Sequence, residues 1–246
     1  MTPLVDRLPF ALLGAVPALV VMLLVDRLAE ARDEPRWLLR HATVCGALVI
    51  VPVLVVELAL VLAGVPLRGH DAGTVACAAF VGAALPEELG KAACLLWLLH
   101  RRVEFHRRGD GIVYGARVGL GFALVETVAW SLTTTNPRQL LLLLLARACL
   151  SVPCHALWSA MMGYAVARRR IDGARGLGLA AAGAIAAHGS FDFGLGLAQL
   201  ADQSADAPAF VRGAAVALLA AVASLVAVHA LLQRARTRDR IDAANE

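Results

Sequence analysis

Charged side chains are scarce in this 246-residue sequence. Aspartate, glutamate, lysine and arginine together make up 17% of the residues, against 59% for hydrophobic types, and the mean hydropathy is +0.70. No polar stretch between the hydrophobic runs is long enough to form a soluble domain. The composition therefore predicts a polytopic membrane protein and, at this length, a single integral membrane domain over residues 1–246.

Several catalytic signatures are also missing. There is no His-Glu-x-x-His motif and no serine in a nucleophile elbow, which argues against a zincin-type protease and against serine catalysis. Cys154 precedes His155 directly, so on a helix it projects about 100° away from that imidazole. The cysteines lie in hydrophobic runs without paired metal-ligand spacing, and we expect packing roles for them; they are Cys45, Cys77, Cys94, Cys149 and Cys154.

Seven hydrophobic segments are each close to or above the ~20 residues that a spanning helix requires. They cover roughly residues 8–25, 42–63, 74–99, 112–131, 139–167, 177–200 and 209–232. The first resembles a signal peptide in position, but its apolar part is too long and Asp6-Arg7 is not a basic leader. We therefore expect an all-α bundle of about seven transmembrane helices in the cell membrane.

Arginines follow a topological pattern. Sixteen of them fall in four groups at residues 27–40, 101–108, 168–175 and 234–240, whereas the alternate loops hold only Arg7, Arg68, Arg138 and Arg212. This positive-inside asymmetry predicts an external N-terminus and a cytoplasmic C-terminus. The net charge of +4 is thus explained by topology and by attraction to membrane lipids, and no nucleic-acid partner is expected.

The most unusual stretch is Leu85-Pro86-Glu87-Glu88-Leu89-Gly90-Lys91, in the middle of a hydrophobic segment. Three unpaired charges at such a depth would cost about 7.5–10 kcal/mol. On a helix Lys91, the only lysine of the chain, reaches both Glu87 and Glu88, which are four and three residues away. Pro86 predicts a break or kink before the acidic pair. A structural ion pair is the alternative interpretation.

Three further segments carry polar residues in their middle. Glu126 shares a helix face with Gly115 and Gly119, whose four-residue spacing is typical of close helix packing. Arg147, Ser151, His155 and Ser159 form one polar stripe, which Pro153 should bend. In the next segment His188 and Asp192 are four apart, so the carboxylate can orient the imidazole.

Counting residues from the charged loops places these groups at one depth. Glu88 lies 13 residues before Arg101, His155 lies 13 before Arg168, and His188 lies 13 after Arg175. Each distance corresponds to about 20 Å, and Glu126 comes to about 24 Å from Asp110. We therefore expect four helices to bring Glu87, Glu88, Glu126, His155 and His188 into one site, with Lys91 and Asp192 in support.

Carboxylates and imidazoles in such a site can activate water, either directly or through a divalent metal such as zinc. His155 and His188 are the candidate metal ligands, with Glu126 or Asp192 completing the set. A non-catalytic scaffold or immunity protein that binds a partner helix through the same cluster is the alternative function. An ion or proton transporter is a third, but no inverted internal repeat is evident.

Four motifs in order resemble those of the PrsW family of intramembrane proteases. They are Pro86 to Lys91, Asp110 to Gly115 running into Gly119 to Glu126, Pro153 to Trp158 with Gly163-Tyr164, and His188 to Asp192. The resemblance covers roughly residues 74–195, within a catalytic core of about 74–200. More distantly, the paired glutamates are similar to those of the membrane glutamate proteases that include the CAAX proteases.

The resemblance implies cleavage of a peptide bond in or near the membrane, in a single-span membrane protein such as an anti-sigma factor. It implies that Glu87 and Glu88 are the required acidic pair, that His155 and His188 are the membrane histidines, and that Glu126 is the third acidic position. The family usually follows that glutamate with asparagine and, three residues on, an aromatic residue. This chain has Thr127 and Trp130 there.

Overall fold

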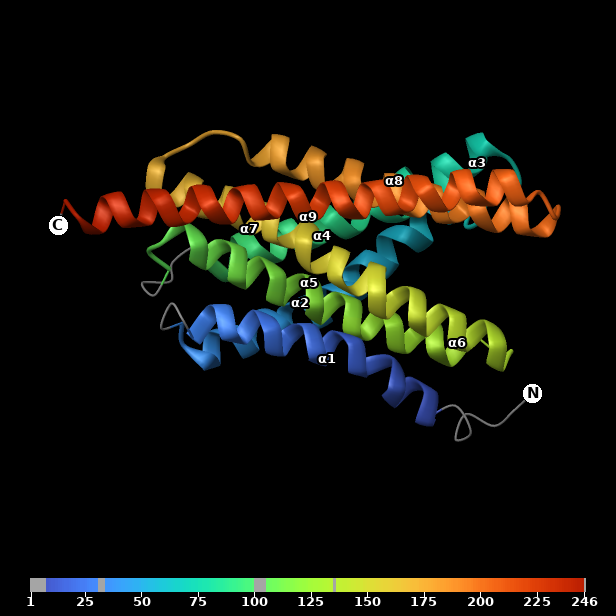
Figure 1. The fold of residues 1–246 in the computed structure, drawn as a ribbon, viewed down its shortest axis with the longest axis horizontal. Coiled ribbons are helices and arrows are strands. Elements are labelled where there is room, and N and C mark those ends of the chain that lie inside the picture. The colour runs from blue at the N-terminus through green and yellow to red at the C-terminus, as the bar shows by residue number, and fades with distance from the viewer. Residues whose placement is uncertain (1–7, 31–33, 100–104, 135, 246) are drawn as a thin grey trace.

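The computed structural model describes residues 8–30, 34–99, 105–134 and 136–245, and these contain helices and no strands. Figure 1 shows the long helices lying side by side in one elongated bundle. Their bounds are α1 Leu8–Glu30, α2 Arg36–Leu62, α3 Ala72–Ala76, η2 Cys77–Ala84, α4 Leu85–Leu99, α5 Arg108–Thr133, α6 Pro137–Ala146, η3 Arg147–Ser151, α7 Val152–Asp172, α8 Leu177–Gln203 and α9 Ala207–Ala243.

Two of the spans are composite. The segment from α3 through η2 to α4 runs without a break, as does the segment from α6 through η3 to α7, and each acts as one long rod. Within the described residues six helical stretches, with each composite span counted once, are long and apolar enough to cross a membrane. The seventh, α8, is as long as α2 but is rich in glycine and alanine and carries His188 and Asp192. The expected polytopic bundle of about seven helices is confirmed.

The arginine-rich helix ends gather at one end of the bundle. In Figure 1 the C-terminal ends of α1, α7 and α9 lie at this end, whereas α1 begins at the opposite end. These are the ends that the positive-inside pattern assigns to the cytoplasm. Four arginines of that pattern, Arg7, Arg32, Arg101 and Arg102, lie outside the described residues.

The central helix, α5, packs against its neighbours through glycines. A Cβ added at Gly119 would lie 2.2 Å from the carbonyl oxygen of His155 in α7, and one at Gly115 would lie 2.2 Å from that of Ser159. On the α2 side, a Cβ at Gly121 would lie 2.0 Å from the carbonyl oxygen of Thr43. The helix backbones therefore touch directly, as the glycine spacing predicts. This contact sets the position of His155 relative to α5.

Pro86 and Pro153, in the interior of the two composite spans, each follow a π-helical turn. The N–H of Leu85 bonds to the carbonyl of Phe80, and the N–H of Val152 bonds to that of Arg147. Each bond closes the wider i→i−5 ring, which lets the helix continue into a proline that lacks a donor of its own. Of the predicted break or kink at Pro86, the break was therefore wrong, because the helix continues through a wider turn, and the kink stays a prediction.

At the cytoplasmic end, Glu34 ties the α1–α2 connection to α5. It is buried and accepts a hydrogen bond from the hydroxyl of Tyr114, while Arg107 Nη2 lies 3.6 Å from its Oε1. Burial, together with the neighbouring carboxyl of Asp110, raises the pKa of Glu34 to about 8. Asp110 and Tyr114 of the Asp-Gly-x-x-Tyr motif thus anchor the first two helices.

The α5–α7 contact predicts a difference between two Gly→Ala variants. Gly119→Ala should destabilise the folded protein by about 1–3 kcal/mol, because its methyl group would collide with a backbone carbonyl. Gly183→Ala on α8 is the matched control, since nothing lies within 4 Å of the added Cβ and alanine favours the helix. Unfolding titrations in detergent measure both, and equal stability of the two variants would contradict the close packing.

Candidate active site

Lys91 occupies the centre of a buried polar cluster made by α4, α5, α7 and α8. Its ammonium lies 3.1 Å from Glu87 Oε2 and 2.8 Å from Glu88 Oε1 on its own helix. It also lies 3.0 Å from Nδ1 of His155 on α7. Glu88 and Lys91 are fully buried, and Glu87 is 6% exposed. One cation therefore compensates two carboxylates where lipid would otherwise make the charges costly.

His188, on α8, lies between two carboxylates. Its Nδ1 is 2.9 Å from Glu88 Oε1 and its Nε2 is 3.2 Å from Asp192 Oδ2. Asp192 is one helical turn along, so it fixes the orientation of the ring. Both partners are carboxylate oxygens, which accept, so the N–H groups of the protonated ring donate to Glu88 and to Asp192.

His155 has the same arrangement on the opposite side of the cluster. Its Nε2 lies 3.0 Å from Glu126 Oε2, and its Nδ1 faces Lys91. The two imidazole rings meet edge to face with centroids 5.2 Å apart. Each histidine thus directs Nδ1 inward and holds Nε2 against an outer carboxylate. Paired with carboxylates in this way, imidazoles have a fixed tautomer and a raised basicity at the inner nitrogen.

Glu126 is itself held by Arg147, a residue that the sequence analysis placed only in a polar stripe. The guanidinium binds both oxygens of Glu126 as a fork, at 3.0 and 2.5 Å, and its Nε donates to the hydroxyl of Thr127 at 2.7 Å. Thr127 therefore serves as an acceptor for this arginine. The spacing of four from Ser151 and eight from His155 was the available signal.

Aromatic rings enclose the cluster. The indole of Trp158 stacks on the ring of His188, with centroids 4.2 Å apart and planes at 14°, and its Nε1 donates to Ser224 on α9. The ring of Phe122 lies 4.1 Å from the ammonium of Lys91. These contacts keep the inner nitrogens in a low-dielectric space. The outer carboxylates remain accessible, with side-chain exposures of 19% for Glu126 and 32% for Asp192.

Four of these residues fit a divalent metal. Glu87, Glu88, His155 and His188 each offer one ligand atom, and these atoms all lie within 4.8 Å of one another. Oxygen and imidazole donors together suit zinc. In the described part of the chain, Glu88 Oε2 is buried without a hydrogen-bond partner, which leaves a ligand atom available. The set differs from the sequence expectation, because Glu126 and Asp192 contact the outer nitrogens of the histidines.

Comparisons with known proteins show the family to which the chain belongs. Residues 34–229 match the profile of the PrsW family intramembrane metalloproteases. The chain is 29% identical over 151 residues to the protease PrsW of Oceanobacillus iheyensis and 30% identical over 151 residues to that of Geobacillus kaustophilus. Each match covers 61% of this chain, and 65% and 62% of the respective relative.

A longer match is to the protease PrsW of Clostridioides difficile, which is 29% identical over 193 residues, or 76% of this chain and 79% of the relative. The matches to the relatives from Oceanobacillus iheyensis and Geobacillus kaustophilus, in contrast, span slightly less than two thirds of those proteins. No solved structure matches the chain. The family profile covers most of the chain, including every residue of the cluster. The chain is therefore a multi-pass integral membrane protein that belongs to the PrsW family of intramembrane metalloproteases.

Proposed function

We propose that this protein is an intramembrane endopeptidase, which hydrolyses a peptide bond of a membrane protein with water activated at the Glu/His cluster. The observation that supports this most directly is the pairing of the two histidines. Both hold Nε2 against an outer carboxylate and turn Nδ1 inward, that of His188 toward Glu88 and that of His155 toward Lys91. A structural ion pair between Lys91 and the glutamates does not require that second layer of carboxylates.

Glu88, His155 and His188 are the residues that would hold the metal. A divalent cation there would supply Lewis-acid chemistry, polarising the scissile carbonyl and favouring deprotonation of water. Glu88 suits a ligand role, because it contacts both Lys91 and His188 and its Oε2 has no hydrogen-bond partner within the described chain. Zinc is the metal that we propose for this mixed set of oxygen and nitrogen donors.

Glu87 is the proposed general base. It makes one hydrogen bond, to Lys91, and keeps 8% of its side chain exposed. In the reaction its carboxylate takes a proton from water as the oxygen attacks the peptide carbonyl, and it then gives that proton to the departing amine. The ammonium of Lys91, between Glu87 and His155, stabilises the negative charge that develops on the carbonyl oxygen.

The proposed substrate is a single-span membrane protein, and an anti-sigma factor is the physiological type that the family resemblance implies. Three of the four helices that form the cluster, α4, α5 and α7, belong to stretches that are apolar enough to span the bilayer, so the scissile bond has to enter at that depth. A segment of the substrate helix would need to unwind there into an extended form, because a helical peptide bond is shielded by its own hydrogen bonds.

Substitutions of Glu87 and Glu88 should have different effects in a paired assay of cleavage and metal content. Glu87→Gln should lower cleavage of a co-expressed single-span substrate at least about a hundredfold while about one zinc ion per chain remains bound. Glu88→Gln and His188→Ala should lower both cleavage and metal content. His229→Ala is the matched control, because that histidine is exposed on α9 outside the cluster.

Elemental analysis of the purified variants and immunoblots of the substrate measure the two quantities. Retained cleavage in Glu87→Gln and Glu88→Gln alike, with all variants folded, would contradict the proposal. A partner protein that is stabilised equally by wild type and by both variants would favour the scaffold interpretation instead.

Arg147 should act as a positioning residue through Glu126 and His155. Arg147→Met should lower kcat about 10- to 100-fold and weaken zinc binding by a similar factor, because Glu126 loses its fork and no longer fixes His155. Arg147→Lys keeps the charge but loses the fork, so it should recover part of both quantities. Kinetics and competitive zinc titration check this, and unchanged values in the folded Met variant would refute it.

A further inference from the structure

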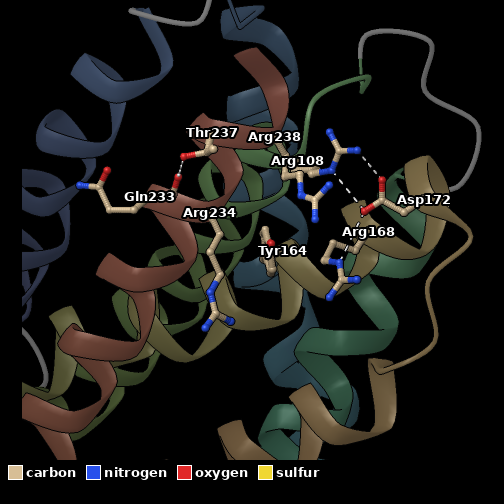
Figure 2. Close-up of a pocket in the computed structure, with 8 residues that line it drawn as sticks. All are labelled: Arg108, Tyr164, Arg168, Asp172, Gln233, Arg234, Thr237 and Arg238. Atoms are coloured by element: carbon tan, nitrogen blue, oxygen red, sulfur yellow. Dashed lines mark hydrogen bonds and ion pairs between the residues drawn. The ribbon is translucent and has the colours of Figure 1, made fainter. Parts of the chain in front are cut away.

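A separate cavity lies at the cytoplasmic end of the bundle. It has a volume of about 790 Å³ and is bordered by α7, α9 and the start of α5, as Figure 2 shows. Tyr164 on α7 lines it and is nine residues from His155, or about 14 Å along the helix. The cavity therefore lies at a different depth along the bundle from the Glu/His cluster. Its charged lining residues are Arg108, Arg168, Asp172, Arg234 and Arg238.

One of these arginines is a structural anchor. Arg108 binds Asp172 on α7, and its Nη1 lies 3.3 Å from Asp239 and 2.5 Å from Asp242 on α9. The three carboxylates around this guanidinium neutralise its charge, so Arg108 has no positive charge left to bind an anion. Its role is to tie α5 to the cytoplasmic ends of α7 and α9, which form the walls of the cavity.

The remaining arginines carry charge that the protein does not neutralise. Within the described residues Arg234 and Arg238 make no ion pair or side-chain hydrogen bond, and Arg168 has only a 3.5 Å contact with Asp172. Tyr164 is drawn between Arg234 and Arg168 in Figure 2, and its hydroxyl makes no hydrogen bond in the described chain. Three guanidinium groups and a hydroxyl donor thus border one cavity, and Asp172, which is bound by Arg108, is the one carboxylate among the lining residues.

We propose that this cavity binds a phosphate group, and that the phosphate is the headgroup of an anionic phospholipid of the cytoplasmic leaflet. Guanidinium groups bind phosphate oxygens through paired N–H donors, and the hydroxyl of Tyr164 adds a further donor. The volume falls within the range of small-molecule sites. Basic pockets between transmembrane helices at the cytoplasmic boundary are suited to acidic lipid headgroups.

The position of the cavity favours a lipid over a soluble phosphate. It opens at the arginine-rich ends of α7 and α9, where the apolar parts of both helices stop and where the positive-inside pattern predicts the cytoplasmic headgroup layer. A lipid bound there would keep its acyl chains in the bilayer beside the apolar part of α9. A free phosphate ion would gain only the polar contacts.

Binding of short-chain phosphatidylglycerol to the detergent-purified protein tests the proposal. Native mass spectrometry counts bound lipids, and titration gives their Kd, with short-chain phosphatidylcholine and inorganic phosphate as parallel probes. The double variant Arg234→Gln/Arg238→Gln should weaken phosphatidylglycerol binding roughly tenfold or more. The matched control is Arg236→Gln/Arg240→Gln, which removes the same charge from the same exposed helix but from positions that do not line the cavity.

Selective weakening in the cavity variant, with phosphatidylglycerol bound more tightly than phosphatidylcholine and inorganic phosphate, would support a headgroup site. Equally tight competition by inorganic phosphate would keep the phosphate site but assign it to a soluble source. Equal weakening in both double variants, or none in either, would overturn the proposal, because it would show only general attraction between a basic surface and acidic lipid. Cleavage activity is not needed for any of these outcomes.

Discussion

The ion pair between Lys91 and the two glutamates is the interaction on which the rest of the site depends. Two adjacent carboxylates at this depth in a membrane could not both be ionised without a nearby cation. Lys91 supplies it from the same helix at distances of 3.1 and 2.8 Å, and its third contact brings in His155 of α7. The ammonium therefore holds an acidic pair and an imidazole together before any substrate or metal is bound.

Two local features of the backbone position the side chains of this site. A π-helical turn precedes Pro86 in one composite span and Pro153 in another, and the site residues Glu87 and His155 follow these prolines within two positions. Wide turns of this kind rotate the helix downstream of them, and they are frequent at functional sites. The glycine contact between α5 and α7 then fixes how closely His155 approaches the central helix.

Much of this arrangement could be predicted from the sequence. Counting residues from the arginine-rich loops placed Glu88, His155 and His188 at one depth, and the structure brings their side chains into one cluster. What counting along single helices could not give was the rotation of one helix against another. Glu126 and Asp192 were therefore weighed as metal ligands, although they contact the outer nitrogens of the two imidazoles.

The contact between Arg147 and Glu126 was not predicted for the same reason, because Glu126 lies on another helix and only the packed bundle brings the two together. The form of the helix at Pro86 was missed because a π-turn has no sequence signature that separates it from a kink. The cavity between α7 and α9 was also out of reach, as its arginines come from segments far apart in the chain.

X-ray absorption spectroscopy of the zinc-loaded protein tests the central claim most directly. If Glu88, His155 and His188 converge on one metal, the spectrum should show a first shell of mixed nitrogen and oxygen at about 2.0–2.2 Å, with the outer-shell scattering of two imidazoles. Removing His188 should leave one imidazole. A shell without imidazole, or one that His188→Ala does not change, would contradict the account.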